Sequence, residues 1–203
     1  MEINNKIIEQ LELHQLWVKT IGKQGRKLGI DEIDLRNIDL TNYTLDQAYI
    51  TECIFSNLNL QKKDFHLSVL CSSIFKSANL IQADFYKADL SYADFSGANV
   101  ENARFAKADC SEAIFSNANL TNANLMACTF YDTNFQNAIL REANVSSSSF
   151  KGTILNGADL SGLKGLDEAV IKTINIGTSE RPIILEGLKA KEWLKMKSQS
   201  LSN

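Results

Sequence analysis

The side chains in this sequence that could move a proton are two histidines and the carboxylates near them. His14 lies in an N-terminal segment, and His66 lies twenty positions after Asp46. A histidine beside a carboxylate can serve as a general acid or base. We predict that His66 stacks one layer from Asp46. Because no serine or cysteine is placed to complete a nucleophilic set, we interpret the two as a surface ion pair.

The four cysteines do not suggest redox or metal chemistry. Cys53, Cys110 and Cys128 fall at positions predicted to point inward, and only Cys71 points outward. Their spacing lacks the C-x-x-C pattern of metal sites, so we interpret them as reduced thiols that act as small apolar side chains. The chain also has no glycine-rich phosphate-binding motif. We therefore predict that the protein is not an enzyme and holds neither a metal nor a cofactor.

A five-residue repeat determines where these side chains point. Every fifth position from Leu35 to Leu160 is apolar, and all ten phenylalanines of the chain stand at these positions, which we call centres. Two residues before each centre the side chain is usually small, most often alanine. Residues two apart on a strand share a face, so the small and the large side chain of each unit would both point inward. The other three residues would face solvent and turn the chain.

Four such units would complete one coil of twenty residues. Phenylalanine recurs every ten residues from Phe55 to Phe115, which places the rings on two opposite walls of a four-sided coil and keeps the volume of each layer constant. Two outward columns recur at multiples of twenty, namely Ile54, Ile74, Ile114 and Ile154, and Asn59, Asn79, Asn99 and Asn119. Coils of this kind must stack to bury their apolar sides, with hydrogen bonds running between them as in a parallel sheet.

The repeated units resemble those of pentapeptide-repeat proteins. The best examples are Ala78-Asn79-Leu80, Ala83-Asp84-Phe85, Ala88-Asp89-Leu90 and Ala93-Asp94-Phe95. The resemblance implies an all-β solenoid, a right-handed quadrilateral parallel β-helix. The first two coils depart from the pattern, since residues larger than usual stand at Ile33, Ile38, Tyr43, Leu58 and Lys63. An inward lysine is costly unless its amine finds a partner or reaches a corner.

Three segments follow from this pattern. Residues 1–32 are predicted to form an N-terminal helical cap, 33–162 the β-helix, and 163–203 a C-terminal helical segment with a short helix at Gly165–Ile174 and a final one at Ile183–Lys197. In relatives a helix after the last coil often joins two copies, so the resemblance implies a homodimer. Its contacts would be Leu185, Leu188, Trp193 and Met196. Folding back as a monomeric cap is the alternative.

Composition and charge predict the compartment of the protein and the classes of partner it does not bind. The net charge is −3 and the hydrophobic fraction is 44%, which is typical of a globular protein that does not bind nucleic acid directly. No apolar run approaches the ~20 residues that span a bilayer, and the N-terminus lacks the features of a secretory signal. We expect a cytoplasmic protein without membrane contact.

Two surface columns lead to two functional hypotheses. One wall is predicted to be acidic, with Glu52, Asp89, Asp109, Glu112 and Asp132 opposed only by Lys151. Such a wall could mimic the phosphates of DNA and bind a topoisomerase, as the quinolone-resistance relatives do with gyrase, although no loop interrupts the repeats here. In the second hypothesis the rod is a rigid scaffold that binds another protein through its terminal helices or through the stripe Ile54, Ile74, Ile114 and Ile154. The stripe could equally serve only to stabilise neighbouring layers.

Overall fold

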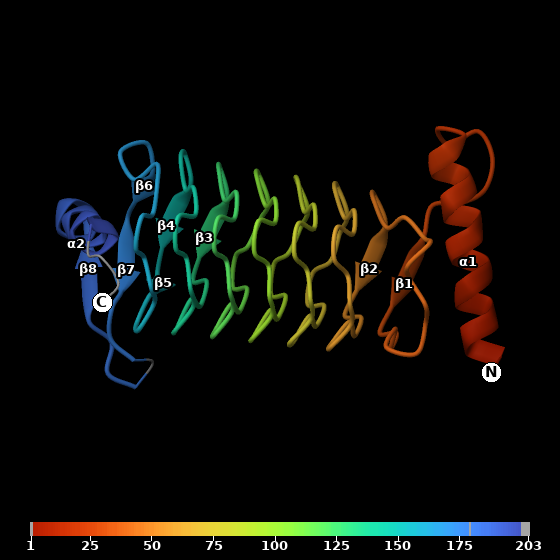
Figure 1. Cartoon of the computed structure of the whole chain (residues 1–203), viewed down its shortest axis with the longest axis horizontal. Helices are drawn as coiled ribbons and strands as arrows, with labels where there is room; N and C mark the ends of the chain where they lie inside the picture. The colour runs from red at the N-terminus through yellow and green to blue at the C-terminus, as the bar shows by residue number, and fades with distance from the viewer. Residues whose placement is uncertain (1, 179, 200–203) are drawn as a thin grey trace.

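The structure, a computed structural model, describes residues 2–178 and 180–199 of the chain. It is a rod of stacked coils with helix α1 (Glu2–Lys19) at one end and helix α2 (Gly187–Gln199) at the other (Figure 1). The regular strands are short: β1 (Gly29–Asp31), β2 (Tyr49–Thr51), β3 (Thr129–Tyr131), β4 (Ser149–Lys151), β5 (Thr153–Ile154), β6 (Val170–Ile171), β7 (Thr173–Asn175) and β8 (Ile184–Glu186). Neither helix is long and apolar enough, over the residues described, to cross a bilayer.

Successive coils are joined by parallel β-bridges between residues twenty positions apart. One coil contributes to four such ladders, through the pairs Ile54↔Ile74, Asn59↔Asn79, Asp64↔Asp84 and Val69↔Asp89. Strands β1 and β2 pair in the same register, with Ile30 opposite Ile50. The predicted twenty-residue coil with four units is therefore confirmed.

The interior is filled by two columns of phenylalanine rings. Phe55 stacks on Phe75 with 4.6 Å between ring centroids, and Phe65 stacks on Phe85 at 5.0 Å. Between the columns the rings meet edge to face, as Phe55 and Phe65 do at 6.0 Å, an arrangement that aromatic quadrupoles favour. The inward alanines are as buried as the rings; Ala93 has no exposed surface. The prediction of rings on two opposite walls is correct from Phe55 to Phe115, whereas Phe130 and Phe150 lie on a third wall.

Most units end in a turn with a left-handed residue two positions after the centre, the units of Leu35 and Leu40 being exceptions. Glu52, Tyr92 and Glu112 have φ of 53°, 61° and 57°, and the same position holds Gly97 and Gly152 in other units. A non-glycine residue in this region costs about 1 kcal/mol or more. The cost is offset by a hydrogen bond to the next coil, since the Tyr92 N–H donates to the Ser111 carbonyl at 2.9 Å.

Lys63 shows how the chain accommodates a lysine in an inward slot. Its Nζ donates to the carbonyl oxygens of Leu40 at 2.6 Å, Tyr43 at 3.0 Å and Thr41 at 3.3 Å. Burial lowers the pKa of this amine, while Asp39 opposes the effect. The amine thus replaces the water it loses with three backbone acceptors.

Helix α1 closes the N-terminal end of the rod, as predicted. Ile7, Leu11 and His14 are buried against the first coil. The His14 side chain joins three segments, because its Nε2 donates to the Asp46 carbonyl and its Nδ1 accepts from the Leu28 N–H, both at 3.1 Å. The helix therefore covers apolar side chains that a terminal coil would otherwise expose.

At the C-terminal end the expected helix at Gly165–Ile174 is wrong. These residues contribute β6 and β7, which continue two ladders of the coil, with Phe150 opposite Ile171 and Thr153 opposite Ile174. Strand β8 then pairs antiparallel with β7. The final helix also starts later than predicted, since residues 184–186 form β8 and α2 begins at Gly187.

Candidate functional site

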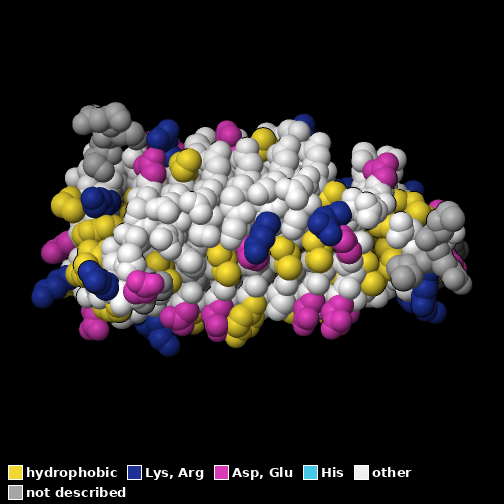
Figure 2. Space-filling model, turned by 90° about the horizontal axis from the view of Figure 1, so that it is seen from below, with side chains coloured by type: hydrophobic (Ala, Val, Ile, Leu, Met, Phe, Trp, Pro, Cys, Tyr) yellow, Lys and Arg dark blue, Asp and Glu magenta, His cyan; other side chains and the backbone are white. Residues whose placement is uncertain are grey.

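One wall of the rod carries an acidic surface. This wall contains the centres Ile30, Ile50, Leu70, Leu90, Cys110, Phe130 and Phe150, and strands β1, β2, β3, β4 and β6 all lie on it. We call its seven carboxylates the acidic face: Asp31, Glu32, Glu52, Asp89, Asp109, Glu112 and Asp132. Figure 2 shows acidic side chains in a broken row along one edge of the rod. The wall up to Gly152 includes a single cation, Lys151.

The backbone places six of these carboxylates in two columns, and the seventh, Asp31, directly follows the centre Ile30. Asp89 and Asp109 lie directly before a centre and form a parallel bridge with each other. Glu32, Glu52, Glu112 and Asp132 instead occupy the left-handed turn position and are exposed. Both positions repeat with the coil, so the charges are held in register along the rod.

Hydroxyl groups rather than cations contact the acidic face. The Ser91 and Ser111 hydroxyls donate to Asp89 and Asp109, each at 2.6 Å, and the Thr51 hydroxyl donates to Asp31. The Tyr92 hydroxyl donates to Glu112 Oε1 at 2.8 Å, and this hydrogen bond raises the pKa of Tyr92. These contacts orient the carboxylates and leave their negative charge in place.

Five acids on the other walls of the rod are neutralised by a lysine or arginine, whereas Asp39 and Glu101 form no ion pair with a described residue. Five ion pairs of this kind lie on the other three walls: Arg36–Asp34 at 2.7 Å, Lys76–Asp94 at 3.1 Å, Arg104–Asp84 at 3.0 Å, Arg141–Asp159 at 2.7 Å and Lys164–Glu142 at 2.9 Å. Within the described residues, no carboxylate of the acidic face forms an ion pair. The uncompensated charge is therefore concentrated on one wall.

Sequence reasoning found five of the seven members of the acidic face and missed Asp31 and Glu32. The repeat was counted from residue 33, yet Ile30 stands five positions before Leu35 and is buried as a centre should be. Extending the register backwards by one unit would have assigned both acids to this wall.

The predicted isoleucine stripe forms a weaker feature. Ile54 and Ile74 are neighbours in one ladder, but Asp94 separates Ile74 from Ile114, and Asn134 separates Ile114 from Ile154. All four isoleucines are only half-buried. Because polar residues interrupt the column, the stripe does not form a continuous apolar surface.

The four predicted dimer contacts divide into two pairs. Leu188 and Met196 are 78% and 59% exposed, whereas Leu185 and Trp193 are half-buried. The face of α2 that packs against the rod is instead formed by Ala190 and Leu194, which the prediction omitted. Leu188 borders an open hollow of about 550 Å³ beside β8, which also includes Ile184, Leu185, Glu186 and Lys189.

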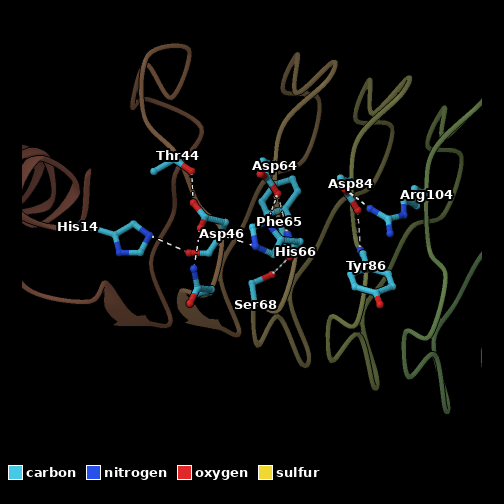
Figure 3. Close-up of polar contacts among 11 residues, drawn as sticks. His14, Thr44, Asp46, Asp64, Phe65, His66, Ser68, Asp84, Tyr86 and Arg104 are labelled. Carbon is cyan, nitrogen blue, oxygen red and sulfur yellow. Dashed lines mark hydrogen bonds and ion pairs between the residues drawn. The ribbon is translucent and has the colours of Figure 1, made fainter. Parts of the chain in front are cut away.

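The histidine and carboxylate cluster lies on another wall, near α1 (Figure 3). His66 Nδ1 lies 2.8 Å from Asp64 Oδ1 and its Nε2 lies 4.0 Å from Asp46 Oδ2, so the predicted proximity to Asp46 is correct. Asp46 is buried and accepts hydrogen bonds from the Thr44 hydroxyl and from Gln47 Nε2. These contacts brace the first coils against each other.

The same wall continues with a second polar group. Arg104 donates to Asp84 at 3.0 Å and its guanidinium carbon lies 4.0 Å from the centre of the Tyr86 ring.

The described part of the chain contains no group of three or more His, Cys, Asp or Glu side chains that could hold a metal ion. Cys53, Cys110 and Cys128 are buried, and burial raises the pKa of the Cys53 thiol to about 11.

Known proteins similar to this chain carry the same repeat. The family model for pentapeptide repeats, which spans eight copies, matches residues 64–102, 93–130 and 128–162. No curated protein sequence matches significantly. A solved pentapeptide repeat protein from the Arabidopsis thaliana thylakoid lumen is 31% identical over 59% of this chain and 69% of its own, with a TM-score of 0.38. The chain belongs to the pentapeptide-repeat family.

Two further solved structures are similar at lower identity. QnrB1, a plasmid-mediated fluoroquinolone resistance protein, is 20% identical over 71% of this chain and 77% of its own, with a TM-score of 0.44. HetL is a pentapeptide repeat protein involved in heterocyst differentiation regulation from the cyanobacterium Nostoc sp. strain PCC 7120. It is 20% identical over 79% of this chain and 94% of its own, with a TM-score of 0.32.

Proposed function

We propose that this protein is a rigid, non-catalytic protein-binding rod whose acidic face contacts a cationic surface of a partner protein. The observation that carries the proposal is the distribution of ion pairs. All seven carboxylates of the acidic face lack a cationic partner within the described residues, while five acids on the other walls are each paired with a lysine or arginine. Uncompensated charge on one side of a protein favours association with a surface of opposite sign.

The rigidity of the coil supports the same function. From Glu52 to Asp132 each carboxylate is carried by a coil that is bonded to the coils on both sides; the Glu112 N–H, for example, donates to the Tyr131 carbonyl at 2.7 Å. A partner that binds such a surface pays little for ordering it, because the charges already hold their positions. The interrupted isoleucine stripe offers no comparable surface.

The test uses a variant that neutralises the four turn carboxylates, Glu32→Gln, Glu52→Gln, Glu112→Gln and Asp132→Asn. Its matched control removes four exposed acids outside the coil, Glu9→Gln, Glu12→Gln, Glu180→Gln and Glu192→Gln. Partners captured by cross-linking are purified and titrated against all three proteins at two salt concentrations. We expect the face variant to lose about tenfold or more in affinity and most of the salt dependence. Equal affinity of the face variant and the control would refute the proposal.

DNA mimicry that targets a topoisomerase such as gyrase is the second candidate. It is supported by the same unpaired carboxylates, because neighbouring members such as Asp89 and Asp109 lie one coil apart, at the ~4.8 Å spacing of stacked strands. Purified protein is added to a gyrase supercoiling assay with and without a quinolone. Inhibition or protection that the face variant has lost would support this candidate, and no effect at micromolar protein would remove it.

The proposal includes four expectations about handedness, domain boundaries, oligomeric state and compartment. We expect the coil to be right-handed, as the family resemblance implies, and the chain to divide near residues 32 and 162. We also expect a homodimer through the C-terminal segment, and residence in the cytoplasm. The exposed Leu188 and Ile184, which line the same hollow, support the homodimer, because monomers rarely expose neighbouring large apolar side chains without a partner.

A further inference from the structure

Strand β1 has one paired edge and one free edge. The Tyr49 N–H donates to the Leu28 carbonyl at 3.0 Å, and the Glu32 N–H donates to the Thr51 carbonyl at 3.1 Å. Because successive residues of a strand direct their backbone groups to opposite sides, Gly29 and Asp31 direct theirs away from β2. Neither residue forms a backbone hydrogen bond on that side within the described chain. An edge of this kind can accept a further strand.

A groove runs between this free edge and α1. It comprises two cavities of about 210 and 330 Å³, and both are lined by Gln10 of α1 and by Gly29. The two cavities therefore lie beside the unpaired backbone of β1, and together we call them the cap groove.

Backbone groups of the cap groove can hold an extended segment. The N–H groups of a segment laid along β1 would donate to the Gly29 and Asp31 carbonyls, and its carbonyls would accept from the N–H groups of these two residues. Gln10 lines both cavities from the α1 side.

The charge of the cap groove indicates the chemistry of its occupant. Lys6, Arg26 and Lys27 line it against one acid, Asp31, whose carboxylate is bonded by the Thr51 hydroxyl. Lys6 and Arg26 form no ion pair with a described residue. The C-terminal end of a second copy fits poorly, because residues 181–203 carry five basic and two acidic side chains.

We propose that the cap groove binds an extended acidic segment of a partner protein, which adds as a strand to the free edge of β1. Main-chain hydrogen bonds to Gly29 and Asp31 hold the segment, and its acidic side chains lie against Lys6 and Arg26. The cap groove shares Asp31 with the acidic face, but its other charged lining residues are cations, so it selects a negative partner and the acidic face a positive one. The two surfaces would let one rod join two different partners.

The test uses a fluorescent synthetic peptide of about eight residues, the length of an ordinary strand, in which valine alternates with glutamate. One control peptide replaces glutamate with lysine, and another carries N-methyl groups on alternate backbone nitrogens. Binding is measured by anisotropy, and hydrogen exchange is measured at the amides of Gly29 and Asp31. We expect binding of the acidic peptide alone, together with slower exchange at these two amides.

Variants of the chain separate strand addition from simple charge attraction. Lys6→Glu with Arg26→Glu should weaken binding by about tenfold or more, whereas Lys62→Glu, an exposed turn lysine of another wall, should leave it unchanged. Gly29→Pro removes one outward N–H and should also weaken binding, with circular dichroism reporting that the coil is intact.

Any one of three results would overturn the proposal. The first is that the anisotropy does not change up to about 1 mM peptide. The second is equal binding of the N-methylated peptide, and the third is binding that leaves hydrogen exchange at the Gly29 and Asp31 amides unchanged. The four-fold acidic-face variant should bind the acidic peptide at least as well as the wild type. The outcome for the cap groove is thus independent of the outcome for the acidic face.

Discussion

His14 donates a hydrogen bond from Nε2 to the carbonyl oxygen of Asp46, across 32 positions of sequence, and this bond ties α1 to the first coil. Since Nδ1 accepts from the Leu28 N–H, the ring is neutral in the docked state. Burial lowers the pKa of His14 below its ordinary value of 6.5; Asp46 opposes this effect, and Lys27 adds to it. Protonation would remove the acceptor at Nδ1 and place a charge in the interface.

We predict that docking of α1 weakens in mild acid. Above pH 6.5 the ring is neutral in both the docked and the undocked chain, so the stabilisation is complete. As the pH falls below 6.5, the undocked ring takes up a proton that the docked ring does not, and the stabilisation is lost progressively toward the lowered pKa. Trp17, which stacks on His14 at 5.9 Å, reports docking by fluorescence in a Trp193→Phe background.

Replacement of the histidines gives the control. His14→Phe should abolish the transition, whereas His66→Gln, which removes the other histidine of the chain, should preserve it. A transition that persists in His14→Phe would assign the pH dependence to other groups.

Two glycines with positive φ should respond differently to alanine. Gly165 has a φ of 80°, and a Cβ there would lie 2.6 Å from the Cα of Ser146 and nearer still to its backbone nitrogen. Gly187 has a φ of 50° and open space around it. We predict that Gly187→Ala costs about 1 kcal/mol from backbone strain alone and Gly165→Ala clearly more. Chemical denaturation measures both, and equal costs would contradict the predicted clash.

The inward alanine slots should not tolerate a large side chain. Ala93 is fully buried between coils, so Ala93→Phe should destabilise the fold by about 3 kcal/mol or prevent folding. Ala106, on the outward side of another unit, is the control, and Ala106→Phe should change the free energy of unfolding by less than about 0.5 kcal/mol. Similar midpoints of denaturation for the two variants would contradict the packing described here.

The acidic face should cost stability rather than provide it. Its carboxylates lie in register without cations, so they repel one another weakly across the coils. The four-fold variant at Glu32, Glu52, Glu112 and Asp132 should therefore melt at the same temperature as the wild type or higher, and the difference should shrink in salt. A clear loss of stability at low salt would mean that these acids serve the fold.

The proposed homodimer depends on exposed side chains of the C-terminal segment. Sedimentation of the wild type at high concentration should give the mass of two chains, and Leu188→Asp should give the mass of one. Leu16→Asp, at an exposed leucine of α1, is the control and should remain dimeric. A wild-type mass of one chain at high concentration would exclude the dimer.

Much of the fold could be predicted because side-chain size alone reveals the layers. The twenty-residue period placed His66 over Asp46 and anticipated that the Lys63 amine would need partners. It could not reveal which acids would be neutralised. Ion pairs such as Arg104–Asp84 form along a ladder, whereas Arg36–Asp34 forms within one unit, so the pairing depends on how long side chains lie on the surface.

The C-terminal end could not be predicted because the repeat changes phase there. Asn144 pairs with Lys164 at a spacing of twenty, but Ser149 pairs with Val170 at twenty-one. One extra residue moves the next buried centres to Leu166 and Ile171, off the five-residue count. The unit Ala169-Val170-Ile171 still has a small and a large inward side chain, which is the signal that could have identified it.

Every coil adds the same rise to the rod, so the length of the rod can change in evolution by whole coils. Duplication or loss of one twenty-residue layer would move the cap groove and the C-terminal segment apart or together by ~4.8 Å without altering either one. The distance between two attached molecules would then be adjustable in fixed increments. A rod of this design is a molecular spacer whose length is set by counting layers.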